Sequence, residues 1–150
     1  MSLVLLDLSG TRRGGAHRDV DSFVTVAEDF IDHARIVGTR CHVRGLTYVP
    51  ATMFCERCFS ELDDWVEVPS RGRVFTYTML YRDLDDEVLA QPAVLAYVKL
   101  DDCDGGLVHH LGEVEPEEVL IGLEVEAVFK DAAERKGSIL DIQYFRPVDG

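Results

Sequence analysis

The segment CHVRGLTYVPATMFCERC, residues 41–58, constrains the fold of this chain more than any other part of it. It ends in a complete Cys-x-x-Cys motif, Cys55 and Cys58, and begins with Cys41, but Arg44 stands where a second such motif would place its other cysteine. Zinc ribbons carry two of these motifs on two tight turns, because four thiolates at about 2.3 Å must surround one ion. Since a guanidinium cannot coordinate a cation, the sequence predicts a ribbon with three cysteine ligands at most.

Three interpretations of these cysteines stay open. Cys41, Cys55 and Cys58 bind zinc, with His42, His33 or a water molecule as the fourth ligand. Alternatively, the ribbon has lost its metal and packing alone stabilises it, or the three cysteines are unrelated buried residues. The spacing between the two ends of the segment, with a glycine turn and a proline inside, is typical of a ribbon. Zinc binding contributes ~10 kcal/mol or more to the folding of small ribbon modules. Because this module is so small, we expect zinc at the three cysteines.

Length and composition indicate one compact domain or two small modules. The chain has 150 residues, 47% of them hydrophobic, and a chain of this size buries roughly 70% of its unfolded surface. The opening MSLVLLDLSG has no basic start and its apolar run stops at Asp7, which predicts neither a signal peptide nor a membrane span. Cys103 lies far from the other three cysteines, a pattern that fits a secreted disulfide framework poorly. We expect a cytoplasmic protein with no membrane partner.

Charge is distributed unevenly along the chain. Residues 1–60 carry seven basic and seven acidic side chains, whereas residues 61–150 carry eight basic and 21 acidic ones and so account for the whole net charge of −13. Nucleic-acid binding depends on Lys and Arg displacing counterions from phosphates. The acidic C-terminal part should repel a polyanion, so we expect no nucleic-acid partner and keep a nucleic-acid-binding module only as an alternative.

Beyond Trp65 the sequence predicts strands separated by turns at even spacing. The runs are rich in β-branched and aromatic residues, and several alternate with period two. The expected strands are residues 72–83, 92–102, 107–114, 123–131 and 138–147, with a short turn or helical piece at 115–122. Five strands with a break after the third suggest a small closed barrel of the OB type. Most of the aromatic residues on these strands are expected in the barrel core: Phe75, Tyr77, Tyr81, Tyr97, Phe129, Tyr144 and Phe145.

The predicted fold class is therefore mainly β, with two modules. A rubredoxin-like zinc-ribbon module, three-cysteine or metal-free, is expected at residues 38–66, and the five-stranded OB-type barrel at residues 67–150. Residues 1–37 are expected to form an N-terminal extension. Within it, residues 19–34 carry apolar side chains at helical spacing, although SFVTV also suits a strand. The apolar stripe of Phe23, Phe30 and Ile31 exceeds what a small ribbon could cover, which predicts a docking segment.

The motifs of the two modules, in this order, resemble a known family. They are GTRCHVRG, CERC, SRGRVFTYT, AVLAYVKLDD and the run PEEVLIGLEVEAVF that ends at Phe129. Over about residues 36–148 the chain resembles the acyl-CoA-associated zinc-ribbon plus OB-fold family, formerly catalogued as a domain of unknown function. Arg44 departs from the metal-binding pattern of that family, whereas the barrel pattern is unaffected.

The resemblance implies an assembly role. Members of that family are mostly small partners of thiolase-superfamily enzymes that bridge subunits and shape the acyl-CoA channel. Resemblance to one subgroup implies that this chain is the small, non-catalytic subunit of an acyltransferase complex. Such a complex acetylates phloroglucinol-type phenols and contains thiolase-like and ketosynthase-like subunits. If the phosphates of CoA touch this chain, they should meet its more basic front part or the partner; the arginines concerned are Arg35, Arg40, Arg44 and Arg57, for which solvated surface is an equal alternative.

A stand-alone acyl-CoA enzyme is the other alternative. Thioester chemistry requires a cysteine activated by a base, and Cys103 with His109 or His110 is the obvious pair. Cys103, however, lies in the acidic turn LDDCDGG, where carboxylates oppose thiolate formation. The two histidines face opposite sides of an alternating strand, so at most one enters the barrel. We expect no catalytic residue, a free thiol exposed at Cys103, and a solvated turn formed by the aspartates around it.

Overall fold

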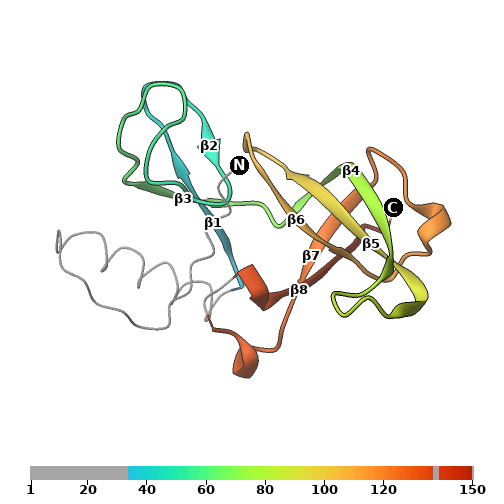
Figure 1. The fold of residues 1–150 in the computed structure, drawn as a ribbon. Coiled ribbons are helices and arrows are strands. Elements are labelled where there is room, and N and C mark those ends of the chain that lie inside the picture. The colour runs from blue at the N-terminus through green and yellow to red at the C-terminus, as the bar shows by residue number, and fades with distance from the viewer. Residues whose placement is uncertain (1–33, 137–138, 150) are drawn as a thin grey trace.

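The computed structural model describes residues 34–136 and 139–149, which form two β units side by side (Figure 1). The strands are β1 (Ile36–Arg40), β2 (Thr47–Tyr48), β3 (Asp64–Val68), β4 (Arg71–Arg82), β5 (Val88–Leu100), β6 (Gly106–Leu111), β7 (Glu124–Phe129) and β8 (Ile142–Pro147). Short 3-10 helices lie in the later connections: η1 (Pro116–Glu118), η2 (Ala132–Glu134) and η3 (Ile139–Asp141). None of the helices in these two ranges has the length and apolar character to span a membrane. The predicted docking stripe falls outside the described residues.

The first unit is a small antiparallel sheet in the order β2-β1-β3. β3 pairs with β1 along its whole length, from Ile36 opposite Val68 to Arg40 opposite Asp64. Apart from the residues that it contributes to the barrel core, the unit has a small core of its own, formed by the buried residues Cys41, Cys55 and Leu62. A ribbon with so few buried side chains gains little from packing alone.

The second unit is a closed five-stranded barrel in the order β4-β5-β6-β8-β7, with β7 pairing back onto β4. All pairs are antiparallel except β6 with β8, which meet in parallel at Leu111 and Phe145. The predicted fold class, mainly β with a ribbon-like module and a five-stranded barrel, is confirmed. The fully buried side chains of the barrel include Val74, Val98, Leu100, Val125 and Phe145.

The expectation that most of the seven barrel aromatics lie in the core is wrong: one of them is buried, two more are partly buried and pack against the core, and four do not belong to it. Phe145 is fully buried, but Phe75 and Tyr81 are 62% and 61% exposed. Successive side chains of a strand point to opposite faces, and Val74 already takes the inward position next to Phe75. The ring of Phe75 lies outside instead, edge-on to Tyr97 with centroids 5.9 Å apart.

The two units share one hydrophobic core and a backbone junction. Ile36, Val49 and Val68 of the ribbon pack in the same buried cluster as the barrel residues. The junction joins the end of β2 to the turn before β6 by three hydrogen bonds: Asp104 N to Thr47 O (2.9 Å), Gly106 N to Val49 O (3.1 Å) and Thr47 N to Asp104 Oδ2 (2.9 Å). A Cβ at Gly105 would lie 2.3 Å from Val49 O, so only glycine permits this approach. The ribbon is therefore held against the barrel by main chain as well as side chains.

Asp104 is exposed, as expected for the solvated turn, but it also fixes the junction, and this predicts a stability effect. Replacing Asp104 with alanine should lower the free energy of unfolding by about 1–3 kcal/mol, because the amide of Thr47, a residue only 3% exposed, loses its acceptor. Asp104→Asn keeps an acceptor oxygen and should cost clearly less. Urea unfolding of both variants measures the difference. An equal loss in the two variants would mean that the charge, and not the acceptor, matters.

Candidate metal site

Two tight turns with the same backbone pattern face each other in the ribbon. In each turn the cysteine carbonyl accepts a hydrogen bond from the amide four residues later, and the cysteine amide donates to the carbonyl five residues later. The bonds are Gly45 N to Cys41 O (2.7 Å), Cys41 N to Leu46 O (2.8 Å), Phe59 N to Cys55 O (2.9 Å) and Cys55 N to Ser60 O (2.9 Å). By this correspondence Arg44 occupies the place of Cys58, and Gly45 the place of Phe59.

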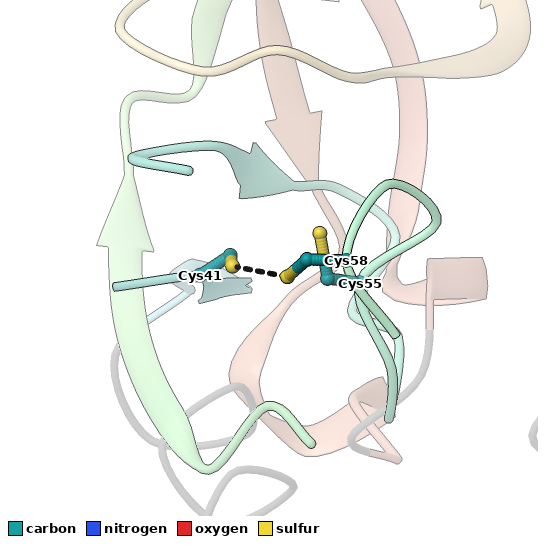
Figure 2. A group of neighbouring side chains, drawn as sticks. All are labelled: Cys41, Cys55 and Cys58. Carbon is teal, nitrogen blue, oxygen red and sulfur yellow. Dashed lines mark hydrogen bonds between the residues drawn. The ribbon is translucent and has the colours of Figure 1, made fainter. Parts of the chain in front are cut away.

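The two turns bring three sulfur atoms together. Figure 2 shows Cys41 approaching from one turn and Cys55 and Cys58 from the other, with 3.6 Å between the Sγ atoms of Cys41 and Cys58. All three Sγ atoms lie within 4.8 Å of one another. Sulfurs at about 2.3 Å from a tetrahedral zinc ion would be separated by about 3.8 Å. The donor set and its spacing therefore fit a metal ion such as zinc.

Hydrogen bonds to the sulfurs favour their ionised form. The Tyr48 hydroxyl, 3.3 Å from Cys55 Sγ, lowers the pKa of Cys55 to about 6 against the opposing effect of burial. The same bond raises the pKa of Tyr48 to about 12. The pKa of Cys41 is lowered chiefly by the Ser60 hydroxyl and also by the backbone amide of Arg44, while burial opposes them. Thiolates are the form of cysteine that binds metal.

The structure separates the fourth-ligand candidates suggested by the sequence. His42 is not in the cluster; its Nε2 lies 3.3 Å from Asp64 Oδ2 and its side chain is 73% exposed. His33 lies outside the described residues. The Ser60 hydroxyl, which sequence reasoning missed, lies 3.0 Å from Cys58 Sγ and 3.5 Å from Cys41 Sγ. Its position two residues after the CERC motif was the available signal.

The structure does not support the alternative cysteine–histidine pair. Cys103 is half-buried, not exposed as expected, and its Sγ donates to the carbonyls of Leu100 (3.4 Å) and Gly105 (3.3 Å). Burial is the main cause that raises the pKa of its thiol. His110 is exposed and lies four strand residues beyond the start of β6, or about 13 Å at ~3.3 Å per residue. His109 faces inward as predicted for one of the pair, and burial lowers its pKa.

Most of the arginines have local partners. In the barrel, Arg71, Arg73, Arg82 and Arg146 each form an ion pair with an acidic residue. Of the four arginines considered for CoA, Arg35 pairs with Glu67 at 3.3 Å and Arg40 Nε donates to Thr47 Oγ1. Arg44 and Arg57 are exposed, one on each turn. The two turns that carry the cysteines thus also carry exposed positive charge.

Large apolar side chains are also exposed around this cluster. We call them the ribbon tip: Val43 (70% exposed), Met53 (45%), Phe54 (55%) and Phe59 (79%). Phe59 has φ of 60°, in the left-handed region, where the first turn has Gly45 at 67°. A bulky residue in this region costs about 1–2 kcal/mol relative to its ordinary conformation. The backbone strain at Phe59 is therefore not offset by burial of its ring among the described residues.

Comparison with known proteins gives sequence relatives over most of the chain. Residues 65–130 match the family model described as ChsH2, C-terminal OB-fold domain. A DUF35 domain-containing scaffold protein of Pyrococcus furiosus is 31% identical over 121 residues, which is 79% of this chain and 88% of the relative. A protein of the same description from Methanocaldococcus jannaschii is 27% identical over 117 residues, 76% of this chain and 82% of the relative.

Two solved structures share the fold. A DUF35-family protein from Sulfolobus solfataricus superposes with a TM-score of 0.61 at 24% identity, covering 85% of each chain. A structure described as Ltp2-ChsH2(DUF35) aldolase gives a TM-score of 0.58 at 24% identity, covering 90% of this chain and 98% of the other. Both combine extensive coverage with low identity, so they support the architecture described above.

Proposed function

This chain belongs to the DUF35 family, and on that premise we propose that it is a non-catalytic scaffold subunit of a thiolase-superfamily acyltransferase complex. In this role it bridges larger thiolase-like and ketosynthase-like subunits and helps to shape the acyl-CoA channel. Acetylation of phloroglucinol-type phenols is the reaction that the resemblance of its motifs suggests. The description of its relatives as scaffold proteins supports the assembly role.

Phe59 is the observation that carries the proposal. Its ring is 79% exposed, and its backbone adopts a conformation that glycine adopts more readily. Aromatic side chains are enriched among the residues that dominate protein interfaces. The ribbon tip therefore supplies an apolar surface, with Phe59 as its most exposed side chain, for a larger subunit to cover.

We further propose that Cys41, Cys55 and Cys58 hold a zinc ion. In such a site zinc supplies a structural cross-link between the two turns. The residues of this chain position it: Tyr48 orients the thiolate of Cys55, and the backbone of each turn fixes its cysteine. This arrangement keeps the ribbon tip rigid, which lowers the entropy lost when a partner binds.

The exposed arginines suggest how acyl-CoA is involved. Arg44 and Arg57 lie on the turns that carry the cysteines, and their guanidinium groups suit phosphate oxygens. CoA bound between this chain and the partner would meet them with its phosphates. Nucleic acid suits the chain less well, because the barrel arginines named above are already paired with acidic residues.

Phe59→Gly tests the docking role without disturbing the fold. The substitution relieves the left-handed strain but adds freedom to the unfolded chain, so the free energy of unfolding should change by no more than about 1 kcal/mol. Affinity for the partner should fall by about tenfold or more, as for an aromatic residue at the centre of an interface. Co-expression with a thiolase-like and a ketosynthase-like subunit, followed by size-exclusion chromatography and titration, measures this.

Leu84→Ser is the matched control. Leu84 is likewise a large apolar residue exposed to solvent, but it lies in the hairpin turn between β4 and β5, away from the ribbon (Figure 1). It should leave the complex intact. Equal binding by wild type and Phe59→Gly would contradict the docking role. An aldolase-type partner is the second candidate, favoured by the description of the structurally similar complex, and the same titration with such a partner distinguishes the two.

A further inference from the structure

Three donor atoms in the ribbon form one face of a tetrahedron. Its edges are 3.6 Å from Cys41 Sγ to Cys58 Sγ, 3.5 Å from Cys41 Sγ to Ser60 Oγ, and 3.0 Å from Cys58 Sγ to Ser60 Oγ. For zinc with Zn–S near 2.3 Å and Zn–O near 2.0 Å, the expected edges are about 3.8 Å between sulfurs and about 3.5 Å between sulfur and oxygen. The observed triangle is slightly contracted, as expected where hydrogen bonds and not an ion join its corners.

We propose that Ser60 Oγ is the fourth donor of the metal site, in place of the cysteine that Arg44 replaces. This inference rests on the proposed zinc site and specifies its ligand set. The fourth cysteine position in the first turn carries an exposed guanidinium, and His42 is turned toward Asp64. Ser60 is the hydroxyl residue that contacts two of the three sulfurs.

The other hydroxyl near the cluster has a different role. Tyr48 O–H lies 3.3 Å from Cys55 Sγ and accepts a hydrogen bond from the amide of Glu56 at 3.3 Å. It contacts a single sulfur and already has two partners. Ser60 corresponds to Leu46 in the first turn, so only the second turn can offer an oxygen at this place.

The charge of the resulting site is consistent with its surroundings. All three cysteines bind as thiolates, any protons that they still carry pass to solvent, and Ser60 coordinates as a neutral hydroxyl. Zn²⁺ with three thiolates then carries a net charge of −1. The exposed guanidinium groups of Arg44 and Arg57 lie on the same two turns and offset this charge.

Cobalt titration of the full-length chain tests the ligand set, because Co²⁺ reports its ligands in its absorption spectrum. We expect Ser60→Ala to weaken Co²⁺ binding by about tenfold or more, with altered d–d bands, while Ser60→Thr retains the hydroxyl and the affinity. Arg44→Cys, at an exposed position, should add a fourth thiolate and raise the sulfur-to-cobalt absorption by about one third, in proportion to the thiolate number. In that background the serine is no longer a ligand, so adding Ser60→Ala should change the affinity by less than about twofold.

The double-mutant comparison separates a ligand from a neighbouring hydrogen-bond donor. An equal loss of affinity from Ser60→Ala in the wild-type and Arg44→Cys backgrounds would show that Ser60 only donates to thiolates, and would overturn the inference. No loss in the wild-type background would also overturn it, in favour of water as the fourth ligand. Absence of stoichiometric Co²⁺ and Zn²⁺ binding by the wild type would instead refute the zinc site itself, which keeps the two failures distinct.

Discussion

Replacing Cys55 with serine is expected to abolish metal binding and to unfold the ribbon around residues 41–62 while the barrel stays folded. Cys55 is fully buried, and the separate ribbon core contains only two other buried residues, Cys41 and Leu62. Hydrophobic burial by three side chains, at about 1.5–3 kcal/mol each, cannot offset the ~1–2 kcal/mol that each ordered residue costs in backbone entropy. A metal ion in the proposed site, worth about 10–16 kcal/mol in small zinc modules, would close this gap.

Elemental analysis and amide hydrogen exchange measure the two parts of this result. Wild type should carry about one zinc per chain, and Cys55→Ser none. Amides of the two turns should lose protection, whereas those of β4 to β8 should keep it. Cys103→Ser is the control, because Cys103 lies outside the cluster and its thiol donates only to backbone carbonyls. Retention of zinc by Cys55→Ser, or loss of protection throughout the barrel, would contradict the expectation.

The barrel was predictable from sequence because its strands alternate and turn residues separate them, but the first residues of two strands, β5 and β8, were not. β5 begins at Val88 and continues through Pro92, where the sequence suggested a start. The pairing with β4 is irregular between Leu80 and Arg82, so the missing amide of proline leaves no gap in the ladder. β8 begins only at Ile142, because residues 139–141 form η3, in which the buried Asp141 carboxylate accepts from the amide of Lys136.

The candidate site was predictable as far as the cysteines and no further. A Cys-x-x-Cys motif has few roles, so Cys41, Cys55 and Cys58 could be grouped from spacing alone. Serine and aspartate have many roles, and their partners here are distant in sequence: Ser60 meets Cys41 across 19 residues and Asp104 meets Thr47 across 57. Only the folded chain identifies such contacts, which is why the missed residues are those that connect separate turns.

Phe145→Ala is expected to lower the free energy of unfolding by about 3–5 kcal/mol, a large share of the roughly 5–15 kcal/mol that stabilises an ordinary domain. Phe145 is the largest fully buried side chain of the described residues. It stands where β8 meets β6, paired with Leu111, and its carbonyl accepts from the amide of Gly112 at 2.8 Å. The ring of His109 packs against it at 6.0 Å. Its side chain therefore fills the core beside the parallel strand pair of the barrel.

Phe145→Leu distinguishes a cavity from a general defect. Leucine keeps most of the buried volume and should cost about half as much or less, because the penalty grows with the space left empty. Urea unfolding followed by tryptophan fluorescence suits the measurement, since Trp65 lies in β3 and reports on the ribbon, while far-ultraviolet circular dichroism reports on the whole sheet. Because the two units share one core, both signals should shift together in Phe145→Ala. A ribbon signal that stays at the wild-type midpoint would show that the junction does not couple the units.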